Sequence, residues 1–273
     1  MPGFRIGDYR IEREVRHEDT GMVYGGVHLV LPRVAAIKVM HPSQAWLREL
    51  AVQILREACI LEALSHPGVP RVFECGVLGD KRPWVAMELI EGVSIAELAH
   101  DGPLPVADLL LALRAAADVL EHAHARGVVH HRLTETSIVR TPKRQSLFSV
   151  RGWGDVVTHD SSLAADPSGD IYALGQIAYR ALIGHDATLD ASTHLAASHA
   201  PPELALLIDE MLSEQTGLRP SAGDVRDRTS HLAETLELSP PAPRTTTGSG
   251  APKPIRDEPS GVFSIRINAP PPR

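Results

Sequence analysis

A lysine in the middle of an otherwise apolar strand constrains the fold of this 273-residue chain more than any other feature. Residues 34–40, VAAIKVM, alternate with the period of two that predicts a strand, and Lys38 shares a face with apolar neighbours. A charge on such a face needs a partner or water. The segment Gln44–Leu64 has helical periodicity and carries Glu57 on its apolar stripe. We therefore predict a helix that packs on a sheet, with Glu57 as the complement of Lys38.

Strand patterns fill the first third of the chain, and helical patterns fill most of the rest. We predict five strands at Tyr9–Val15, Val23–Leu29, Val34–Met40, Val69–Val77 and Trp84–Leu89. Beyond them we predict helices at Val106–His124, Asp170–Ile183, Pro202–Leu212 and Ser221–Leu236. The expected fold is α+β. A small lobe, residues 1–90, has a five-stranded sheet and one helix, and a mainly helical lobe spans residues 91–238.

The last part of the chain has a different composition. Residues 239–273 are rich in Pro, Thr, Ser and Gly, so we expect a disordered tail that cannot bury enough apolar area to fold. Within it, Val262–Ile267 alternates apolar and polar positions. That segment would suit addition to the edge of a sheet. A disordered end with chance apolar residues explains it equally well.

Composition limits the classes of partner. The formal net charge is -7 and no basic block occurs, which argues against nucleic acid and anionic membranes as main partners. No window reaches about 18 uninterrupted apolar residues, so no membrane span is expected. The two cysteines, Cys59 and Cys75, lack metal-ligand spacing. We expect reduced, buried thiols and a cytoplasmic location. No four histidines converge at the spacing of a zinc site, and no metal is expected.

Residues 128–139 read VVHHRLTETSIV, and this stretch resembles the catalytic loop of the protein kinase family, VVHRDLKPxNIL. Seven further stretches look like landmarks of the bacterial, eukaryotic-like serine/threonine kinases, in the same order: YRIERE, AAIKVM, LSHPGVPRV, MELIEG, HARGVVH, SGDIYALG and GLRPSA. They cover nearly everything from Tyr9 to Leu238. The resemblance implies two lobes with a nucleotide cleft between them.

The same alignment removes the residues that carry the family's chemistry. Arg132 stands at the position of the catalytic Asp, Thr134 at that of the Lys, and Ser137 at that of the Asn that holds a second metal ion. The metal-binding Asp of the DFG motif is replaced by Gly152, in the sequence Gly152-Trp153-Gly154. On this resemblance the general base and both metal ligands are absent.

The nucleotide-binding residues are partly retained. Lys38 and Glu57 match the family's phosphate-binding ion pair, although such a pair also serves simply to hold a strand to a helix. The glycine-rich loop falls on residues 16–21, where Arg16 and Glu18 replace two glycines and Gly21 remains. Side chains there block the approach of phosphate, and we favour a plain hairpin. The resemblance puts Met87 at the back of the nucleotide pocket. It makes the backbone from Glu88 to Ile90 the hinge that would contact adenine.

Two other positions have scaffold roles in the family. The resemblance implies that Asp170 hydrogen-bonds the backbone of the catalytic loop and that Trp153 packs between the lobes. The segment Asp155–Gly169 is short for an activation segment and has no APE motif, so Arg219 lacks its usual partner. Its serines, Ser161 and Ser162, are better explained as turn residues than as phosphorylation sites.

These observations predict a pseudokinase: a catalytically inactive, kinase-like signalling or scaffold protein that binds another signalling protein or a kinase. One alternative is an ATP-dependent serine/threonine protein kinase with atypical catalytic residues. Another is a nucleotide sensor whose bound ATP sets lobe closure. Losing two carboxylates and gaining Arg132 shifts the cleft by three charges toward positive. ATP could therefore bind without magnesium, its phosphates facing Lys38 and Arg132; no other cofactor is expected.

Overall fold

The computed structural model describes residues 4–18, 20–44, 48–141, 146–153, 166–183 and 200–236. The chain divides into a compact unit, Met1–Pro241, and a second unit, Ala242–Arg273. The predicted tail, with its segment Val262–Ile267, lies outside the described residues, and so do Gly154, Asp155, Ser161 and Ser162.

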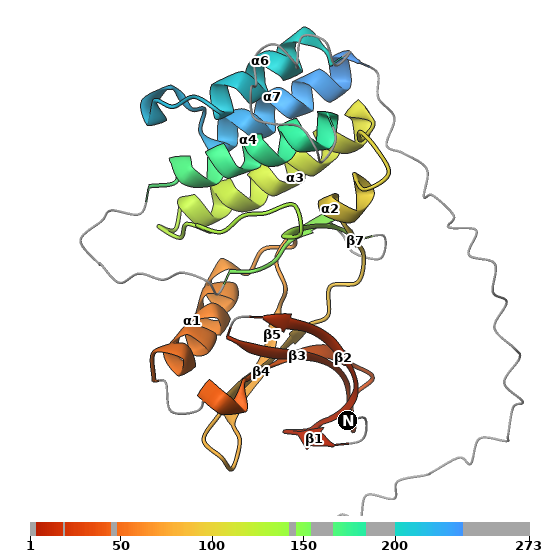
Figure 1. Cartoon of the computed structure of the whole chain (residues 1–273), viewed down its shortest axis with the longest axis vertical. Helices are drawn as coiled ribbons and strands as arrows, with labels where there is room; N and C mark the ends of the chain where they lie inside the picture. The colour runs from red at the N-terminus through yellow and green to blue at the C-terminus, as the bar shows by residue number, and fades with distance from the viewer. Residues whose placement is uncertain are drawn as a thin grey trace, which may run out of the picture. The chain divides into compact units, whose positions relative to one another are not determined.

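The N-terminal lobe is built on an antiparallel six-stranded sheet of order β1-β2-β3-β4-β6-β5 (Figure 1). Its strands are β1 (Arg5–Ile6), β2 (Tyr9–Glu18), β3 (Gly21–His28), β4 (Val34–Met40), β5 (Val72–Val77) and β6 (Pro83–Glu88). All five predicted strands are present. The predicted number is one too low, because β1 has only two residues and is too short to show a period-two pattern.

Helix α1 (Arg48–Leu64) packs against β4, β5 and β6 of this sheet. It begins four residues later than predicted, because residues 42–44 form a short 3₁₀ turn, η1. The buried stripe of α1 is made of Ile54, Glu57, Ala58, Leu61 and Leu64, as the helical period predicts. Cys59 lies off this stripe and is exposed, as is Cys75, so the expectation of buried thiols is wrong.

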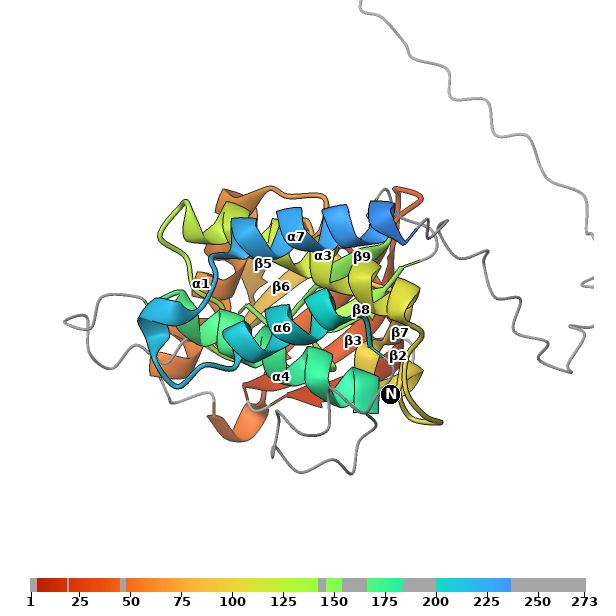
Figure 2. The same ribbon diagram turned by 90° about the horizontal axis from the view of Figure 1, so that it is seen from above.

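The C-terminal lobe consists mainly of helices, and α3 (Val106–His124) has its largest helix contact with α7. Its other helices are α2 (Ile95–Leu98), α4 (Ser168–Ile183), α6 (Pro202–Met211), η2 (Thr216–Leu218) and α7 (Ala222–Thr235). Figures 1 and 2 show α3, α4, α6 and α7 stacked together, and α3 contacts both α4 and α7. The four long predicted helices are confirmed, with ends within two residues of those predicted.

A second sheet, absent from the prediction, lies where the lobes meet. It has the order β7-β8-β9, with β7 (Val93–Ser94), β8 (Ile138–Arg140) and β9 (Phe148–Val150). Each strand has two or three residues. Strands β8 and β9 place the catalytic-loop residues and Gly152 side by side, because each segment continues directly from one end of a paired strand.

One apolar core runs through both lobes. A single cluster of buried side chains includes Ile54 and Leu61 of α1, Met87 of β6 and Leu113 of α3. Each such side chain contributes about 1.5–3 kcal/mol when fully buried. The lobes are therefore held together by shared apolar packing as well as by the chain. Among the described residues, no helix is both long and apolar enough to cross a bilayer.

Candidate functional site

Lys38 is the centre of a buried charge cluster in the small lobe. Its Nζ lies 2.6 Å from Oε2 of Glu57, and only 5% of the lysine side chain is exposed. The predicted contact between β4 and α1 is therefore present. A second carboxylate reaches the same amine, because Oε2 of Glu18 lies 2.8 Å from Nζ of Lys38. Two acidic residues from two different elements thus bind one lysine.

The sheet register explains how Glu18 reaches Lys38. Arg16 of β2, Val23 of β3 and Lys38 of β4 lie opposite one another, and Glu18 pairs with Gly21 two residues further along. Residues two apart share a face of a sheet, so Glu18 and Lys38 are on the same face with β3 between them. The Glu18 carboxylate therefore reaches Lys38 across β3.

Gly21 itself is fixed by close packing. A Cβ atom at this position would lie 2.1 Å from the carbonyl oxygen of Val39. The one glycine that remains of the glycine-rich pattern is therefore required by the approach of β3 to β4. Strands β2 and β3 form a hairpin that is paired from Tyr9–His28 to Glu18–Gly21, and Gly21 is buried in it. That this hairpin does not bind phosphate stays a prediction.

The electrostatics of this cluster favour the charged forms of Lys38 and Glu18. Burial opposes the charged form of Lys38, but the carboxylates of Glu57 and Glu18 outweigh it and raise the lysine pKa to about 12. Burial also opposes ionisation of Glu18, yet Lys38 and Arg16 lower its pKa overall. Arg16 Nε donates to Glu18 Oε1 over 2.6 Å. Two cations and two carboxylates therefore neutralise one another.

Arg151 faces this cluster from the other lobe. Burial, followed by the charge of Arg16, lowers its pKa, whereas Glu97 and Glu18 act in the opposite direction. Its Nε donates to the carbonyl oxygen of Thr136 over 3.1 Å. Together with Glu97 it borders a pocket of about 510 Å³. Arg151 immediately precedes Gly152, and nothing in the sequence pattern singled it out.

The catalytic-loop segment is held by Asp170 of α4, as predicted. Its two carboxylate oxygens accept the backbone N–H groups of His130 and His131, each over 2.8 Å. Nε2 of His124 lies 2.9 Å from the same carboxylate. Burial raises the pKa of Asp170, but these hydrogen bonds lower it overall. His131 is thereby held at a φ of 64°, a conformation uncommon for residues other than glycine.

Two of the four substituted positions of the motif bind each other. Thr134 donates its backbone N–H to the Ser137 hydroxyl over 3.2 Å, and the two hydroxyl oxygens are 3.0 Å apart. Ser137 is buried and lies beside Gly152, whose φ is 89°. The Arg132 side chain is exposed, whereas Lys38 is buried. Among the described residues, no three carboxylate, imidazole or thiol groups gather as a metal site would require.

The hinge residues lie at the end of β6. Met87 is 7% exposed and pairs with Ala36 of β4, at the inner side of the sheet. Glu88 donates its backbone N–H to the Arg71 carbonyl over 2.8 Å. Ile90 is partly buried. The predicted pocket wall and hinge are therefore adjacent, whereas a role in binding adenine stays a prediction.

Sequence relatives of this chain are kinases of bacteria. Serine/threonine-protein kinase pkn2 of Myxococcus xanthus is 28% identical over 294 residues, which cover 90% of this chain and 35% of that protein. Serine/threonine-protein kinase PknL of Mycobacterium tuberculosis is 27% identical over 201 residues, covering 65% of this chain and 49% of that protein.

This chain is a homologue of the bacterial, eukaryotic-like serine/threonine kinases. It spans between about a third and a half of the length of these curated relatives. No family model matches it.

The fold of the kinase homologue agrees with that relationship. The crystal structure of the PknI kinase domain of Mycobacterium tuberculosis superposes with a TM-score of 0.67 at 22% identity, covering 85% of this chain and 98% of that domain. The two-lobed α+β architecture predicted from the sequence is thus the kinase fold.

The structure also shows where Trp153 and Arg219 lie, the two remaining residues for which the kinase resemblance implied a role. Trp153 is 1% exposed, lies in the core shared by the lobes, and contacts the His130 ring at a tilt of 59° with ring centroids 4.7 Å apart. Arg219, expected to lack its usual partner, donates to the carbonyl oxygens of Ser213 and Ser168 and lies over the ring of Tyr172. The Arg219 position therefore has a new structural role.

Proposed function

We propose that this kinase homologue does not transfer phosphate and acts by binding a signalling protein or a kinase. The observation that carries the proposal is the Glu18 carboxylate on Lys38. In the kinase family the corresponding lysine contacts nucleotide phosphates. Here an anionic side chain of the protein already occupies the amine, and it comes from the loop that would otherwise admit the phosphates.

The far side of the cleft supports the same proposal. Phosphoryl transfer depends on metal ions held by protein oxygen ligands and on a residue that orients the nucleophile. A guanidinium stands at the position of the base, at Arg132, and hydroxyl and hydrogen stand at the two metal-ligand positions, Ser137 and Gly152. Magnesium prefers carboxylate and phosphate oxygens, which these residues do not supply.

Nucleotide binding at this cleft requires that Glu18 leave Lys38. Breaking a buried ion pair from one side costs about 3–5 kcal/mol. Since 24% of the Glu18 side chain is exposed, the cost for this pair falls to about 2–3 kcal/mol. ATP without magnesium would add its own negative charge beside Glu18 and Glu97. We infer that the protein binds ATP weakly or not at all, with or without metal.

One observation favours a second candidate, an ATP-dependent serine/threonine protein kinase with atypical residues. The Lys38–Glu57 ion pair that active kinases require is intact at 2.6 Å. In that case Glu18 would swing away when ATP enters, and Arg151 or Arg132 would neutralise phosphate charge. In a nucleotide sensor, Glu18 would likewise move away from Lys38 when ATP enters, but no phosphate would be transferred.

The partner and location belong to the same proposal. Because the relatives are named as serine/threonine kinases, a kinase or one of its substrates is the partner that we propose. A cytoplasmic setting is supported by Cys59 and Cys75, which form no disulfide with each other.

A phosphotransfer assay separates the candidates. Purified protein is incubated with radioactive ATP, Mg²⁺ or Mn²⁺ and a mixed protein substrate, beside a Lys38→Arg variant. Arginine preserves the charge between the two carboxylates, whereas its geometry differs. We expect equal background labelling for both proteins. Labelling by the natural sequence that Lys38→Arg abolishes would establish the atypical kinase instead.

A further inference from the structure

The loop between α1 and β5 joins the helix that carries Glu57 to the C-terminal lobe. We call residues 65–68 the α1–β5 joint. The Gly68 carbonyl accepts the backbone N–H of Val150 over 2.8 Å. A Cβ atom at Gly68 would lie 2.3 Å from Cγ2 of Val119 on α3. The joint therefore packs closely against α3 and is hydrogen-bonded to β9.

Two histidine rings contact each other at the joint, one from the joint itself and one from α3. His66 lies within it, and His122 comes from α3, with ring centroids 4.8 Å apart. Nε2 of His122 lies 2.7 Å from the carbonyl oxygen of Leu64, the last residue of α1. Because a carbonyl only accepts, this nitrogen carries a proton. The contact satisfies a carbonyl that the helix end would otherwise leave without an intrahelical partner.

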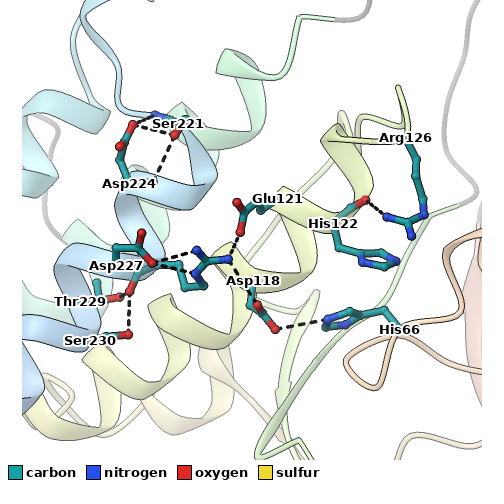
Figure 3. Close-up of polar contacts among 11 residues, drawn as sticks. His66, Asp118, Glu121, His122, Arg126, Ser221, Asp224, Asp227, Thr229 and Ser230 are labelled. Carbon is teal, nitrogen blue, oxygen red and sulfur yellow. Dashed lines mark hydrogen bonds and ion pairs between the residues drawn. The ribbon is translucent and has the colours of Figure 1, made fainter.

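The hydrogen bonds of His66 fix its protonation state. Its Nδ1 accepts the backbone N–H of Gly68 over 3.0 Å, so this nitrogen has no proton. Its Nε2 lies 3.3 Å from Oδ2 of Asp118 and donates to it, as Figure 3 shows. His66 is thus neutral in this arrangement. A second proton would have to go to Nδ1, where it would oppose the Gly68 N–H.

The charged groups around His66 come from α3 and α7. Asp118 favours a protonated His66, whereas His122 and Arg126 disfavour it. Arg126 donates to the His122 carbonyl (Figure 3). Arg226 of α7 lies 3.9 Å from Asp118 and is also paired with Glu121 and Asp227. Arg114 lines the same pocket as His66. His122 and Arg126 therefore act against Asp118 on the His66 ring.

Protons can reach the ring. A pocket of about 440 Å³ opens beside His66, between α3, α7 and the turn before β9. The His66 side chain is 15% exposed and that of Asp118 is 49% exposed. A group that solvent reaches, and whose neutral form is required by a backbone hydrogen bond, has the properties of a pH sensor.

We propose that His66 is a proton-operated switch in the α1–β5 joint. Proton uptake at Nδ1 breaks the bond from Gly68, places two cationic rings next to each other when His122 is also charged, and loosens α1 from the C-terminal lobe. Since α1 carries Glu57, acid would alter the position of the charge cluster and any partner surface on that helix. This switch goes beyond the proposed function, and it would work in an active or an inactive kinase homologue.

The direction of the pH effect follows from the surroundings of the ring. Burial lowers the pKa of His66 below its usual 6.5, and Asp118 only partly opposes this. The unfolded chain therefore binds a proton at a higher pH than the folded one. Stability conferred by neutral His66 is complete above pH 6.5 and is lost as the pH falls through the folded pKa.

His66→Asn is the decisive variant. The Asn side-chain oxygen lies two bonds from Cβ, as Nδ1 does, so it can accept the Gly68 N–H, and it does not titrate. His100→Asn is the matched control, because His100 is exposed and lies outside the joint. All proteins are first compared by circular dichroism at pH 7.5 to show that they fold.

Amide hydrogen exchange of the full chain then tests the switch. Peptides covering residues 61–72 are followed at pH 7.5 and 5.5 after correction for intrinsic exchange. In the natural sequence and in His100→Asn we expect about fivefold faster exchange at pH 5.5, as for the loss of one hydrogen bond that limits local opening. In His66→Asn we expect no change. Equal protection at both pH values in the natural sequence, or the same loss in His66→Asn, overturns the proposal.

A second variant covers the case in which His66→Asn does not fold. In His122→Gln the amide nitrogen can still donate to Leu64, but the charge that disfavours protonation of His66 is removed. We expect the midpoint of the exchange transition to move to higher pH. An unchanged or lower midpoint would show that another group titrates. Neither outcome depends on whether the protein transfers phosphate.

Discussion

Glu18→Gln tests most directly whether the Glu18 carboxylate keeps nucleotide phosphates away from Lys38. The change removes one negative charge from Lys38, leaves the Glu57 contact at 2.6 Å in place and keeps the length of the side chain. The charge of the cluster rises by one. If Glu18 excludes phosphate, its removal should create an anion site that the natural sequence hides.

The size of the effect follows from the cluster. Lys38 is 5% exposed and Glu18 is 24% exposed. Breaking such a partly buried pair costs about 2–3 kcal/mol, below the cost for a fully buried one. That energy corresponds to roughly 30- to 150-fold in affinity. We therefore expect ATP to bind the variant tighter by about that factor in EDTA, where no metal contributes.

Titration with a fluorescent ATP analogue measures this gain, with unlabelled ATP as competitor. Glu12→Gln is the matched control, because Glu12 lies on the same strand and forms an exposed ion pair with Arg10. The control should bind as weakly as the natural sequence. Equal affinity of Glu18→Gln and Glu12→Gln would refute the idea that Glu18 stands in for phosphate.

Three further predictions concern the same cluster. Lys38→Met should lower the free energy of unfolding by about 3 kcal/mol, because the buried Glu57 and the partly buried Glu18 carboxylates are then left without the lysine; adding Glu57→Gln should recover part of the loss in urea denaturation. Gly21→Ala should cost more than about 2 kcal/mol, because its Cβ would meet the backbone of β4, whereas Gly79→Ala, with open space around it, should change stability little in the same assay. The depressed pKa of Glu18 predicts stability that is lost below pH 4.5, and the Lys38 pKa of about 12 predicts stability that is lost only above pH 10.5. Hence the affinity gain in Glu18→Gln should be the same at pH 6 and pH 9, and a gain confined to one end of that range would contradict the assignment.

Strong periodicity made the large elements predictable. Val34–Met40 and Val106–His124 have the predicted bounds, because a period of two and a period of 3.6 are sustained over their whole length. The Lys38–Glu57 contact follows from the same patterns, since each charge interrupts an apolar face. The very short strands β1, β7, β8 and β9 have too few residues to show any period.

The second partner of Lys38 was beyond a sequence-based prediction. Glu18 was expected to lie in a plain hairpin whose side chains block phosphate, and no contact with Lys38 was predicted for it; its carboxylate contacts the lysine across β3. That contact depends on the register of three strands. Arg151 was missed for a similar reason, because its position next to the cluster arises from how β9 lies relative to the small lobe. The short spacing between Glu18 and Gly21, which marks a tight hairpin, was the one sequence signal that could have placed Glu18 near the strand that carries Lys38.

A crystal structure of the natural sequence soaked with ATP and magnesium tests the central claim most directly. The account predicts an intact contact between Glu18 and Lys38 near the present 2.8 Å, with no phosphate density in the cleft. Phosphate oxygens bound to Lys38, with Glu18 turned away and a metal ion held near Ser137 or Gly152, would contradict it.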